Sequence, residues 1–317
     1  MENHFDVIVI GGGAAGLTAG IYLSRAKVNT LILNEGAVGG QMVLTHEIAN
    51  YPGVESISGY QLARNMKAQA QKFGCTIKSN LTITNLELNG ELKTVTVNNK
   101  ETYSANAVIL ATGGKSRMLG VPGEEKFKGK GISYCATCDG DFFRDKEIIV
   151  VGGGNSALEE AVSLTKYASK VTIVHQFDHF QALEHYIEEA RSNEKINFIM
   201  ESRISEFLGG EKLEKVLIQN LSSNQIETMN VDGVFIFIGY VPNTEKIAGA
   251  VELNEWKEII VDKNMAANIP GVFAAGDSTA KRYRQVTTAV ADGTIAALSA
   301  SEYINEFKKS GAMTEAV

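Results

Sequence analysis

Two stretches of this sequence share one pattern of hydrophobic and polar positions. Each begins with a run of β-branched residues that ends abruptly in three glycines, DVIVIGGGAAG at 6–16 and EIIVVGGGNSA at 147–157. A helical pattern follows each run, and a second apolar strand follows each helix. The residue near the end of that strand, Asn34 or His175, lies 23 residues after the first glycine in both copies. This repeat predicts two strand–turn–helix–strand units of the dinucleotide-binding type.

The glycines indicate what such units bind. Without side chains they let the backbone approach a pyrophosphate, which then lies against unpaired amides at a helix N-terminus. The strand that follows the helix is TLILNE at 30–35 in the first copy and VTIVHQ at 171–176 in the second, so both copies have the expected context. A second nucleotide turn is therefore expected at Gly152, Gly154, Asn155, Ser156 and Ala157.

The rest of the pattern predicts how two units share the chain. Residues 76–110 alternate as short strands and end in NAVILATGG, and a second β-rich stretch closes in VDGVFIFIGYVPNTE. PGVFAAGDST at 270–279 adds a buried strand, and a helical run follows at 284–304. We expect an α/β fold with two Rossmann-like dinucleotide-binding domains (three-layer ββα type), the second inserted into the first. The predicted parts are a first domain at 1–115 and 247–317 and an inserted domain at 116–246.

Composition and charge exclude several classes of function. The chain has 317 residues, of which 44% are hydrophobic and 21% are charged, and this length favours two domains. A net charge of −7 argues against nucleic acid or an anionic membrane as the main partner. No apolar run reaches the ~18–20 residues of a membrane helix, and the N-terminus lacks the cationic segment of a signal peptide. We therefore expect a cytoplasmic protein.

The stretch GISYCATCDGDFF at 131–143 holds two of the three cysteines, Cys135 and Cys138. A zinc site needs four ligands, but the only other cysteine is Cys75 and the nearest histidines lie far downstream, so no metal is expected. A purely structural bridge would close a very short loop and add little stability. A redox dithiol is the favoured interpretation, because a CxxC arrangement lowers the pKa of its exposed thiol and the thiolate is the nucleophile.

Nine motifs occur in an order that resembles one known family. They are GGGAAG (11–16), GGQM (39–42), NYPG (50–53), ATGG (111–114), CATCDG (135–140), GGGNSALEEA (152–161), GYVPNT (239–244), GVFAAGDS (271–278) and RQVTTAVADG (284–293). The chain resembles the low-molecular-weight thioredoxin reductases over nearly its whole length. CATCDG just ahead of the second glycine motif is the most specific element of the resemblance.

The resemblance implies FAD as the cofactor of the first glycine turn. It places the ribityl chain at Asp277, the isoalloxazine at Arg284, and Gln41 on the flavin side. One position departs from the family pattern, because the ribose-binding acid usually stands where this chain has Asn34, while the acid here is Glu35. The implied FAD residues are Gly11, Gly13, Ala14, Gly16, Asn34, Glu35, Gly40, Gln41, Asn50, Thr112, Gly113, Gly276, Asp277, Arg284, Gln285 and Val286.

The resemblance also implies roles for the dithiol. Cys138 would meet the flavin and Cys135 would attack the disulfide of thioredoxin, with Asp139 as the acid that protonates the leaving thiolate. The alternative for Asp139 is a helix N-cap or turn residue. The family moves its dithiol by rotating the inserted domain, which would place hinges at 114–120 and 243–248. A homodimer is expected on the same ground.

The second nucleotide site departs from the family in its charges. NADPH-dependent members carry arginines for the 2′-phosphate where this chain has Gln176, Phe177 and Gln181, and residues 171–190 contain no Lys or Arg. Each lost charge-assisted bond would cost ~1.5–3 kcal/mol. We therefore expect the donor to be NADH or reduced ferredoxin, with ordinary NADPH use disfavoured. A flavin-dependent dithiol oxidase that passes electrons from a small dithiol to oxygen is the alternative function.

A protein donor would need basic docking residues despite the acidic chain. Two clusters of basic residues are candidate docking sites for an acidic ferredoxin. The alternative is that they are ordinary solvated cations beside one flavin-contacting arginine. The first cluster is Lys126, Lys128 and Lys130, and the second is Lys281, Arg282 and Arg284.

Overall fold

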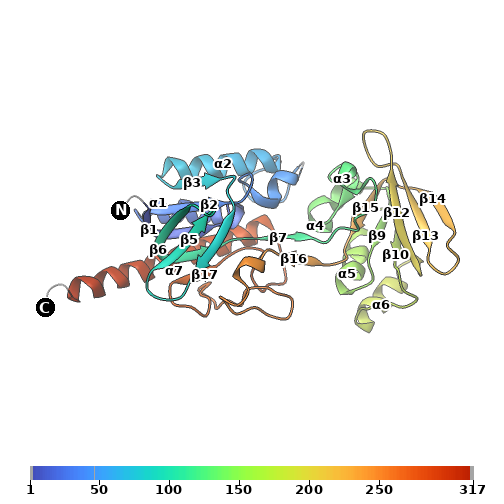
Figure 1. Cartoon of the computed structure of the whole chain (residues 1–317). Helices are drawn as coiled ribbons and strands as arrows, with labels where there is room; N and C mark the ends of the chain where they lie inside the picture. Colours follow the sequence, from blue (N-terminus) through green and yellow to red (C-terminus); the bar gives the residue numbers. More distant parts are fainter. Residues whose placement is uncertain (1–2, 46, 315–317) are drawn as a thin grey trace. The chain divides into compact units, whose positions relative to one another are not determined.

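The computed structural model describes residues 3–45 and 47–314, which form two compact units (Figure 1). The first unit comprises Met1–Lys115 and Val241–Val317, and the second comprises Ser116–Tyr240. The chain thus leaves the first unit, builds the second and returns. The two connecting segments pair with each other as strands β7 (Gly114–Ser116) and β16 (Tyr240–Pro242).

The return to the first unit occurs earlier than the sequence predicted. The expected boundary was residue 246, but the second unit ends at Tyr240. The reason is the anchoring of Asn243, whose backbone N–H donates to the carbonyl of Gly113 at 2.9 Å. Its side-chain amide also donates to the carbonyl of Thr112 at 3.0 Å. These bonds attach the segment after β16 to the first unit.

A mixed sheet forms the centre of the first unit, in the order β3-β2-β1-β6-β5-β4, with β17 also paired to β6. The strands β1, β2, β3, β6 and β17 pair in parallel, while β4 and β5 are antiparallel additions. The bounds are β1 (His4–Ile10), β2 (Thr30–Asn34), β3 (Thr76–Ser79), β4 (Ile83–Glu87), β5 (Lys93–Val97), β6 (Glu101–Leu110) and β17 (Val272–Ala274).

The central strand β1 shows why this sheet is buried on both faces. Val7 and Val9 belong to the core on one side, and Ile8 and Ile10 belong to a second core on the other side. This follows from the period of two along a strand, because a run of β-branched residues supplies both faces with apolar side chains. The predicted α/β fold class is confirmed.

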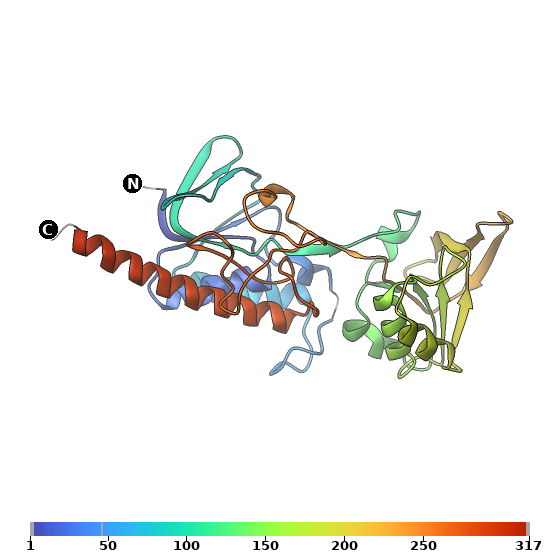
Figure 2. The same ribbon diagram turned by 90° about the horizontal axis from the view of Figure 1, so that it is seen from below.

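Three helices cover one face of this sheet, with α1 packed against both α2 and α7 (Figure 1). Their bounds are α1 (Ala14–Arg25), α2 (Gly59–Lys72) and α7 (Val286–Thr314). Figure 2 shows α7 in red as one continuous helix. The sequence predicted a helical run that ends at residue 304, but the helix continues to Thr314. The short 3-10 helices of this unit are η1 (Gly40–Leu44) and η3 (Glu245–Ile247).

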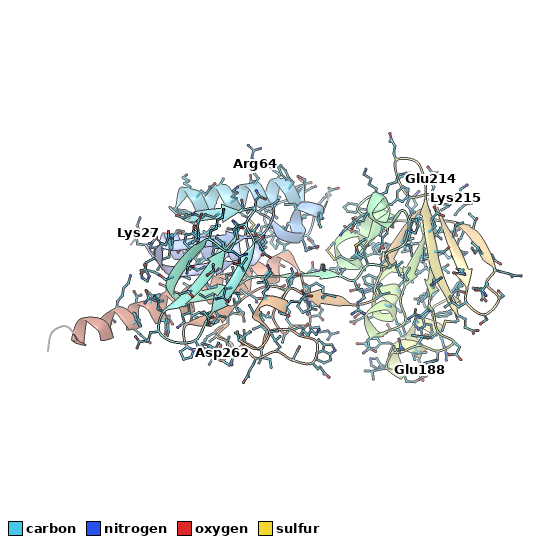
Figure 3. All side chains as sticks on the ribbon, viewed as in Figure 1. Lys27, Arg64, Glu188, Glu214, Lys215 and Asp262 are labelled. Carbon is cyan, nitrogen blue, oxygen red and sulfur yellow. A yellow bond between two sulfur atoms is a disulfide. The ribbon has the colours of Figure 1, made fainter. Side chains whose placement is uncertain are left out.

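The second unit repeats the parallel arrangement on a smaller scale. Its five-stranded sheet has the order β11-β10-β9-β15-β8, and a separate antiparallel sheet has the order β12-β13-β14. Charged side chains such as Glu188 on α6 and Lys215 on β13 project from its surface (Figure 3). The bounds are β8 (Ile132–Ser133), β9 (Glu147–Val151), β10 (Lys170–Val174), β11 (Ile196–Ile199), β12 (Ser202–Leu208), β13 (Lys215–Asn220), β14 (Ile226–Asn230), β15 (Gly233–Ile236), α3 (Glu124–Phe127), α4 (Ala136–Asp139), η2 (Gly140–Phe143), α5 (Asn155–Leu164) and α6 (Glu184–Arg191).

Two features are absent from the part of the chain that the structure describes. None of the helices between residues 3 and 314 combines the length and the apolar character that crossing a bilayer requires. In the same part of the chain, no group of three or more His, Cys, Asp or Glu side chains is arranged to hold a metal ion.

Candidate active site

The first glycine turn connects β1 to α1 at very short range. Gly11 has a φ of +109°, and a Cβ built on it would lie 2.1 Å from the carbonyl oxygen of Ala111. A Cβ on Gly16 would lie 1.9 Å from the carbonyl oxygen of Gly11. Side chains are therefore excluded at both positions. Helix α1 begins at Ala14 after the N-cap Gly13, with no side-chain cap and no acid in its first turn, so its first amides are available to an anion.

Asn34 lies directly against this turn. Its Oδ1 accepts a hydrogen bond from the backbone N–H of Gly12 at 2.7 Å, and only 7% of the residue is exposed. The side chain of Glu35 has different partners, since it accepts from the backbone N–H of Ile83 at 2.7 Å and forms an ion pair with Lys246. Of the two residues considered for the ribose, Asn34 is therefore the one in contact with the glycine turn.

Four buried polar side-chain atoms in this unit lack a hydrogen-bond partner among the described residues: Oδ1 of Asp277, Oγ1 of Thr112, Oγ of Ser24 and Oγ of Ser278. Asp277 and Thr112 are the two that belong to the predicted FAD residues. Burial raises the pKa of Asp277, and the nearby cations Lys281 and Arg284 oppose this shift. Gly276 packs against α1, because a Cβ built on it would lie 2.9 Å from the Cβ of Ala15. Unpaired buried polar atoms beside a glycine turn are the arrangement that a ligand with hydroxyl groups would complete.

Two acidic residues that the sequence analysis did not identify hold this region in place. Asp292 on α7 accepts from the backbone N–H of Gly276 at 3.0 Å and forms a largely buried ion pair with Lys281. Glu258 forms a similar pair with Arg284, whose Nε also donates to the carbonyl of Asp277 at 3.4 Å. The sequence could have indicated Asp292, because an acidic residue within the apolar part of RQVTTAVADG is unusual. No local sequence pattern indicated Glu258.

The structure brings together two predicted residues that are far apart in the sequence. The side-chain amide of Asn50 donates to Oε1 of Gln285 at 3.4 Å. Gln41 lies exposed on η1, next to Gly40, and the backbone N–H of Gly39 donates to the carbonyl of Gly12 at 2.8 Å. The GGQM segment therefore lies against the first glycine turn. Val286 is the first residue of α7, and Gly113 has a φ of +62° at the end of the ATGG segment.

The second unit contains a disulfide between Cys135 and Cys138, with a Cα–Cα distance of 5.3 Å. Cys135 is the residue before α4, and the backbone N–H of Cys138 donates to its Sγ at 3.1 Å. Both cysteines are half-buried, and Thr137 between them is exposed. A reduced Cys135 would thus be a reachable thiolate with an amide donor already directed at it. Cys75, by contrast, is buried and forms no disulfide, and burial raises the pKa of its thiol to about 11.

Asp139 follows the dithiol and is held by Ser133. The hydroxyl of Ser133 donates to Oδ2 of Asp139 at 2.6 Å and also accepts from the backbone N–H of Cys135 at 3.1 Å. Burial raises the pKa of Asp139, and the bond from Ser133 opposes this shift. The carboxyl makes no side-chain cap for η2, which follows it. A carboxyl with a raised pKa beside a disulfide can hold a proton for a leaving thiolate.

The second glycine turn connects β9 to α5 in the same manner as the first. The N-cap Gly154 has no side-chain cap, and α5 has no acid in its first turn. The segment after β10 is attached to this turn, since the backbone N–H of Gln181 donates to the carbonyl of Gly153 at 2.8 Å. Oδ1 of Asn155 accepts from the backbone N–H of Leu183, also at 2.8 Å. At the three positions expected to hold arginine in NADPH enzymes, Gln176, Phe177 and Gln181 are exposed.

The two basic clusters differ in their surroundings. In the second cluster, Lys281 and Arg284 are paired with acids and their side chains are only 15% and 22% exposed. Lys281 is therefore not a solvated cation, whereas Arg282 of the same cluster is exposed. In the first cluster, Lys126 and Lys130 are exposed, and the ammonium group of Lys128 lies 5.3 Å from the ring centre of Tyr134.

Comparisons with known proteins agree with this geometry. A model of the pyridine nucleotide-disulphide oxidoreductases matches residues 5–293. The chain is 45% identical over 303 residues to the 34.2 kDa protein in rubredoxin operon of Clostridium pasteurianum, covering 96% of this chain and 98% of that one. It is 45% identical over 311 residues to the thioredoxin reductase of Peptoclostridium acidaminophilum, covering 96% of this chain and 98% of that one.

A solved structure extends the comparison to the fold. The crystal structure of thioredoxin reductase from Streptococcus pyogenes matches with a TM-score of 0.93 at 41% identity, covering 96% of this chain and 100% of that one. The protein is thus an FAD-dependent oxidoreductase with a redox-active disulfide. The chain belongs to the pyridine nucleotide-disulphide oxidoreductase family, among the low-molecular-weight thioredoxin reductases.

The residues of the first unit fit FAD by their chemistry. The glycine turn offers amides for a pyrophosphate, and the unpaired oxygens of Asp277 and Thr112 offer acceptors for hydroxyl groups.

We expect the substitution Asp277→Ala to weaken FAD binding by roughly 10–100-fold. It removes an acceptor whose hydrogen bond to a ligand hydroxyl is worth about 1.5–3 kcal/mol. The measurement is fluorescence titration of the FAD-depleted protein with FAD. Asp262→Ala, an exposed acid in the same unit, is the control (Figure 3). Equal FAD affinity in Asp277→Ala and the parent would contradict this assignment.

Proposed function

We propose that this protein is a thioredoxin-disulfide reductase that passes electrons from a donor through FAD and the Cys135–Cys138 dithiol to thioredoxin. The observation that carries the proposal is the half-buried disulfide with Asp139 beside it. The similarity to proteins named thioredoxin reductase supports thioredoxin as the substrate. FAD, when bound, supplies the two electrons that reduce the disulfide to two thiols.

The dithiol would then reduce thioredoxin by thiol–disulfide exchange. The thiolate of Cys135 attacks one sulfur of the thioredoxin disulfide, which forms a mixed disulfide and releases the other thioredoxin sulfur as a thiolate. That thiolate takes a proton from the carboxyl of Asp139. The carboxylate of Asp139 next takes the proton of the Cys138 thiol, and the resulting thiolate attacks Sγ of Cys135, so that the intramolecular disulfide re-forms. The second thioredoxin sulfur leaves as a thiolate and takes this proton from Asp139, which regains from solvent the proton that Cys135 gave up when it ionised. Two electrons and two protons have then reached thioredoxin.

The geometry favours Cys135 as the attacking residue. The backbone N–H of Cys138 already donates to its Sγ at 3.1 Å, and a donor directed at sulfur stabilises the thiolate. Cys138 is then left to resolve the mixed disulfide.

The role of Asp139 predicts a pH dependence. A general acid acts in its protonated form, so the rate of thioredoxin reduction should fall as pH rises through the raised pKa of Asp139. Asp139→Asn should lower this rate by about 10²–10⁴-fold. In Ser133→Ala the bond that lowers the pKa of Asp139 is lost, so the falling limb should move to higher pH. The measurement is a pH–rate profile for all three proteins, and an unchanged limb in Ser133→Ala would contradict the role of Asp139.

The electron donor is proposed to be reduced ferredoxin or NADH, with NADPH disfavoured. Supporting this, the positions at the end of β10 that would hold arginines carry Gln176, Phe177 and Gln181. A 2′-phosphate there would lie beside the carboxylate of Asp178 without a cation from residues 171–190. An acidic ferredoxin would dock on Lys126, Lys128 and Lys130, the cluster that retains exposed cations.

Further features of the family are carried over as proposals. We propose that the unit at Ser116–Tyr240 is a domain of the pyridine-nucleotide type that moves about its two chain crossings, β7 and β16. β7 lies within the expected hinge at 114–120, whereas β16 ends just before the expected hinge at 243–248. We also propose a cytoplasmic homodimer.

The function can be tested without knowing the natural donor. The FAD-loaded protein is reduced anaerobically with dithionite, the excess is removed, and oxidised thioredoxin is added. Excess dithionite reduces both the flavin and the disulfide, so the expected result is two reduced thioredoxins, with four new thiols, for each protein chain. Failure to form thioredoxin thiols, combined with rapid oxygen consumption when a small dithiol is supplied, would instead support the dithiol oxidase.

A further inference from the structure

Glu124 is a buried carboxylate that the proposed mechanism does not use. It is the first residue of α3, and only 1% of the residue is exposed. Its Oε1 accepts from the backbone N–H of Leu119 at 3.0 Å, and its Oε2 accepts from that of Gly120 at 2.7 Å. The third donor is the hydroxyl of Tyr134, which lies 2.8 Å from Oε1. A buried carboxylate requires such donors, because an unmet acceptor in the interior costs free energy.

The three donors lie at two separate places in the second unit. Leu119 and Gly120 follow shortly after β7, where the chain enters this unit. Tyr134 directly precedes Cys135, the first cysteine of the disulfide. Through Glu124, the entry segment is therefore joined to the residue next to the disulfide, and all the joined residues belong to one unit.

The side chain of Tyr134 is fixed at both its ring and its hydroxyl. The ring packs against an apolar core of the second unit, and the ammonium group of Lys128 lies 5.3 Å from the ring centre. Burial raises the pKa of the Tyr134 hydroxyl, and the hydrogen bond to Glu124 adds to this shift. The hydroxyl therefore keeps its proton near neutral pH and remains a donor to the carboxylate.

The segment before the disulfide is held from two sides. The bonds of Ser133 stay within the segment, since its hydroxyl donates to Asp139 and accepts from the backbone N–H of Cys135. Neighbouring side chains of an extended segment point to opposite sides, and Tyr134 is directed to Glu124 instead. Loss of the Tyr134 hydroxyl would leave the bonds of Ser133 in place and remove the connection to the entry segment.

We propose that Tyr134 and Glu124 are positioning residues that hold Cys135 at the distance from Cys138 that a disulfide requires. The two Cα atoms are 5.3 Å apart, within the range of roughly 4.4–6.8 Å found in disulfides. Holding the reduced cysteines at this distance raises the effective concentration of one thiol at the other, so the disulfide closes at a smaller entropic cost. The same restraint speeds the attack of Cys138 that releases thioredoxin. These roles deepen the proposed function and rest on the redox activity of the cysteine pair.

The first test is the equilibrium of the FAD-loaded protein with glutathione. Two glutathione thiols are oxidised to glutathione disulfide while the Cys135–Cys138 bond is reduced to two thiols. Tyr134→Phe removes only the hydroxyl, and it should shift this equilibrium toward the dithiol by about three- to tenfold. Thiols are counted by alkylation and mass spectrometry, and flavin absorbance records electrons held by FAD. Tyr186→Phe, the same change at a half-buried tyrosine of the same unit, is the matched control and should leave the equilibrium unchanged.

A double-mutant cycle tests whether the two residues act through their shared bond. Glu124→Gln replaces a charged acceptor by a neutral amide with one oxygen, so it should shift the glutathione equilibrium in the same direction as Tyr134→Phe. Because each change weakens one and the same bond, the double variant should shift the equilibrium by less than the product of the two single shifts. A shift equal to that product would show that the residues act independently and would overturn the coupling.

Thioredoxin reduction separates positioning from a loss of stability. In single turnovers of the dithionite-reduced protein, Tyr134→Phe should lower the maximal rate by about three- to tenfold and leave the half-saturating thioredoxin concentration unchanged. A lower melting temperature with an unchanged glutathione equilibrium would assign Tyr134 a structural role only and overturn the proposal. If the parent protein forms no thioredoxin thiols, the proposed substrate is wrong, whereas the glutathione equilibrium still decides the role of Tyr134.

Discussion

Replacement of either Cys135 or Cys138 by serine is expected to abolish thioredoxin reduction while FAD stays bound. A serine hydroxyl is not ionised near neutral pH and cannot form a disulfide, so the rate should fall by at least about 10³-fold. The cysteines lie in the second unit, whereas the turn that fits FAD lies in the first, so flavin content should not change. The measurement is thioredoxin reduction by the dithionite-reduced protein, with the flavin spectrum recorded for each variant.

Cys75→Ser is the matched control for this experiment. Cys75 is buried in the first unit, and burial raises the pKa of its thiol to about 11, so it is not a reactive thiolate. Thioredoxin reduction by this variant should equal that of the parent protein. Near-full turnover in Cys135→Ser or Cys138→Ser would show that electrons reach thioredoxin by another route.

The second prediction with a large expected effect concerns NADPH use after arginines are introduced in the segment that follows β10. The combined variant Gln176→Arg, Phe177→Arg and Gln181→Arg would offer charge-assisted bonds to a 2′-phosphate, each worth about 1.5–3 kcal/mol. Two such bonds predict that the concentration of NADPH needed for half-maximal flavin reduction falls by at least about 100-fold. The measurement is anaerobic flavin reduction by NADPH and NADH. The effect of the arginines should weaken as salt is added.

The control for charge is the variant that carries alanine at positions 176, 177 and 181. It removes the same side chains without adding cations, so its NADPH dependence should remain that of the parent protein. If the arginine variant gains no NADPH use although it folds and binds FAD, then the missing cations are not what disfavours NADPH.

Features set by local pattern could be predicted from the sequence. The β-branched runs before each glycine turn became the buried strands β1 and β9, because a strand that packs on both faces needs apolar residues at consecutive positions. The glycines of the turns became close backbone contacts, such as that between Gly11 and Ala111. The cysteine pair with its adjacent acid is local as well, and the structure joins Cys135 to Cys138.

Features set by long-range contacts could not be predicted in this way. The pairing of Arg284 with Glu258 and of Lys281 with Asp292 depends on which segments fold together, and the charges alone suggested a free basic surface. The unit boundary at Tyr240 depends on hydrogen bonds of Asn243 across the chain. The bond from Tyr134 to Glu124 depends on burial of the carboxylate, which a glutamate in a polar segment does not reveal.

The most direct test of the proposed electron path is anaerobic stopped-flow reduction of the flavin. The FAD-loaded protein is mixed separately with NADPH, NADH and reduced ferredoxin at two ionic strengths, and oxidised thioredoxin is present in a parallel series. The predicted result is fast flavin reduction by ferredoxin or NADH, followed by thioredoxin thiols, with no advantage for NADPH. A ferredoxin docked on Lys126, Lys128 and Lys130 should react more slowly at high salt. Fast, saturable reduction by micromolar NADPH would contradict the proposed donor.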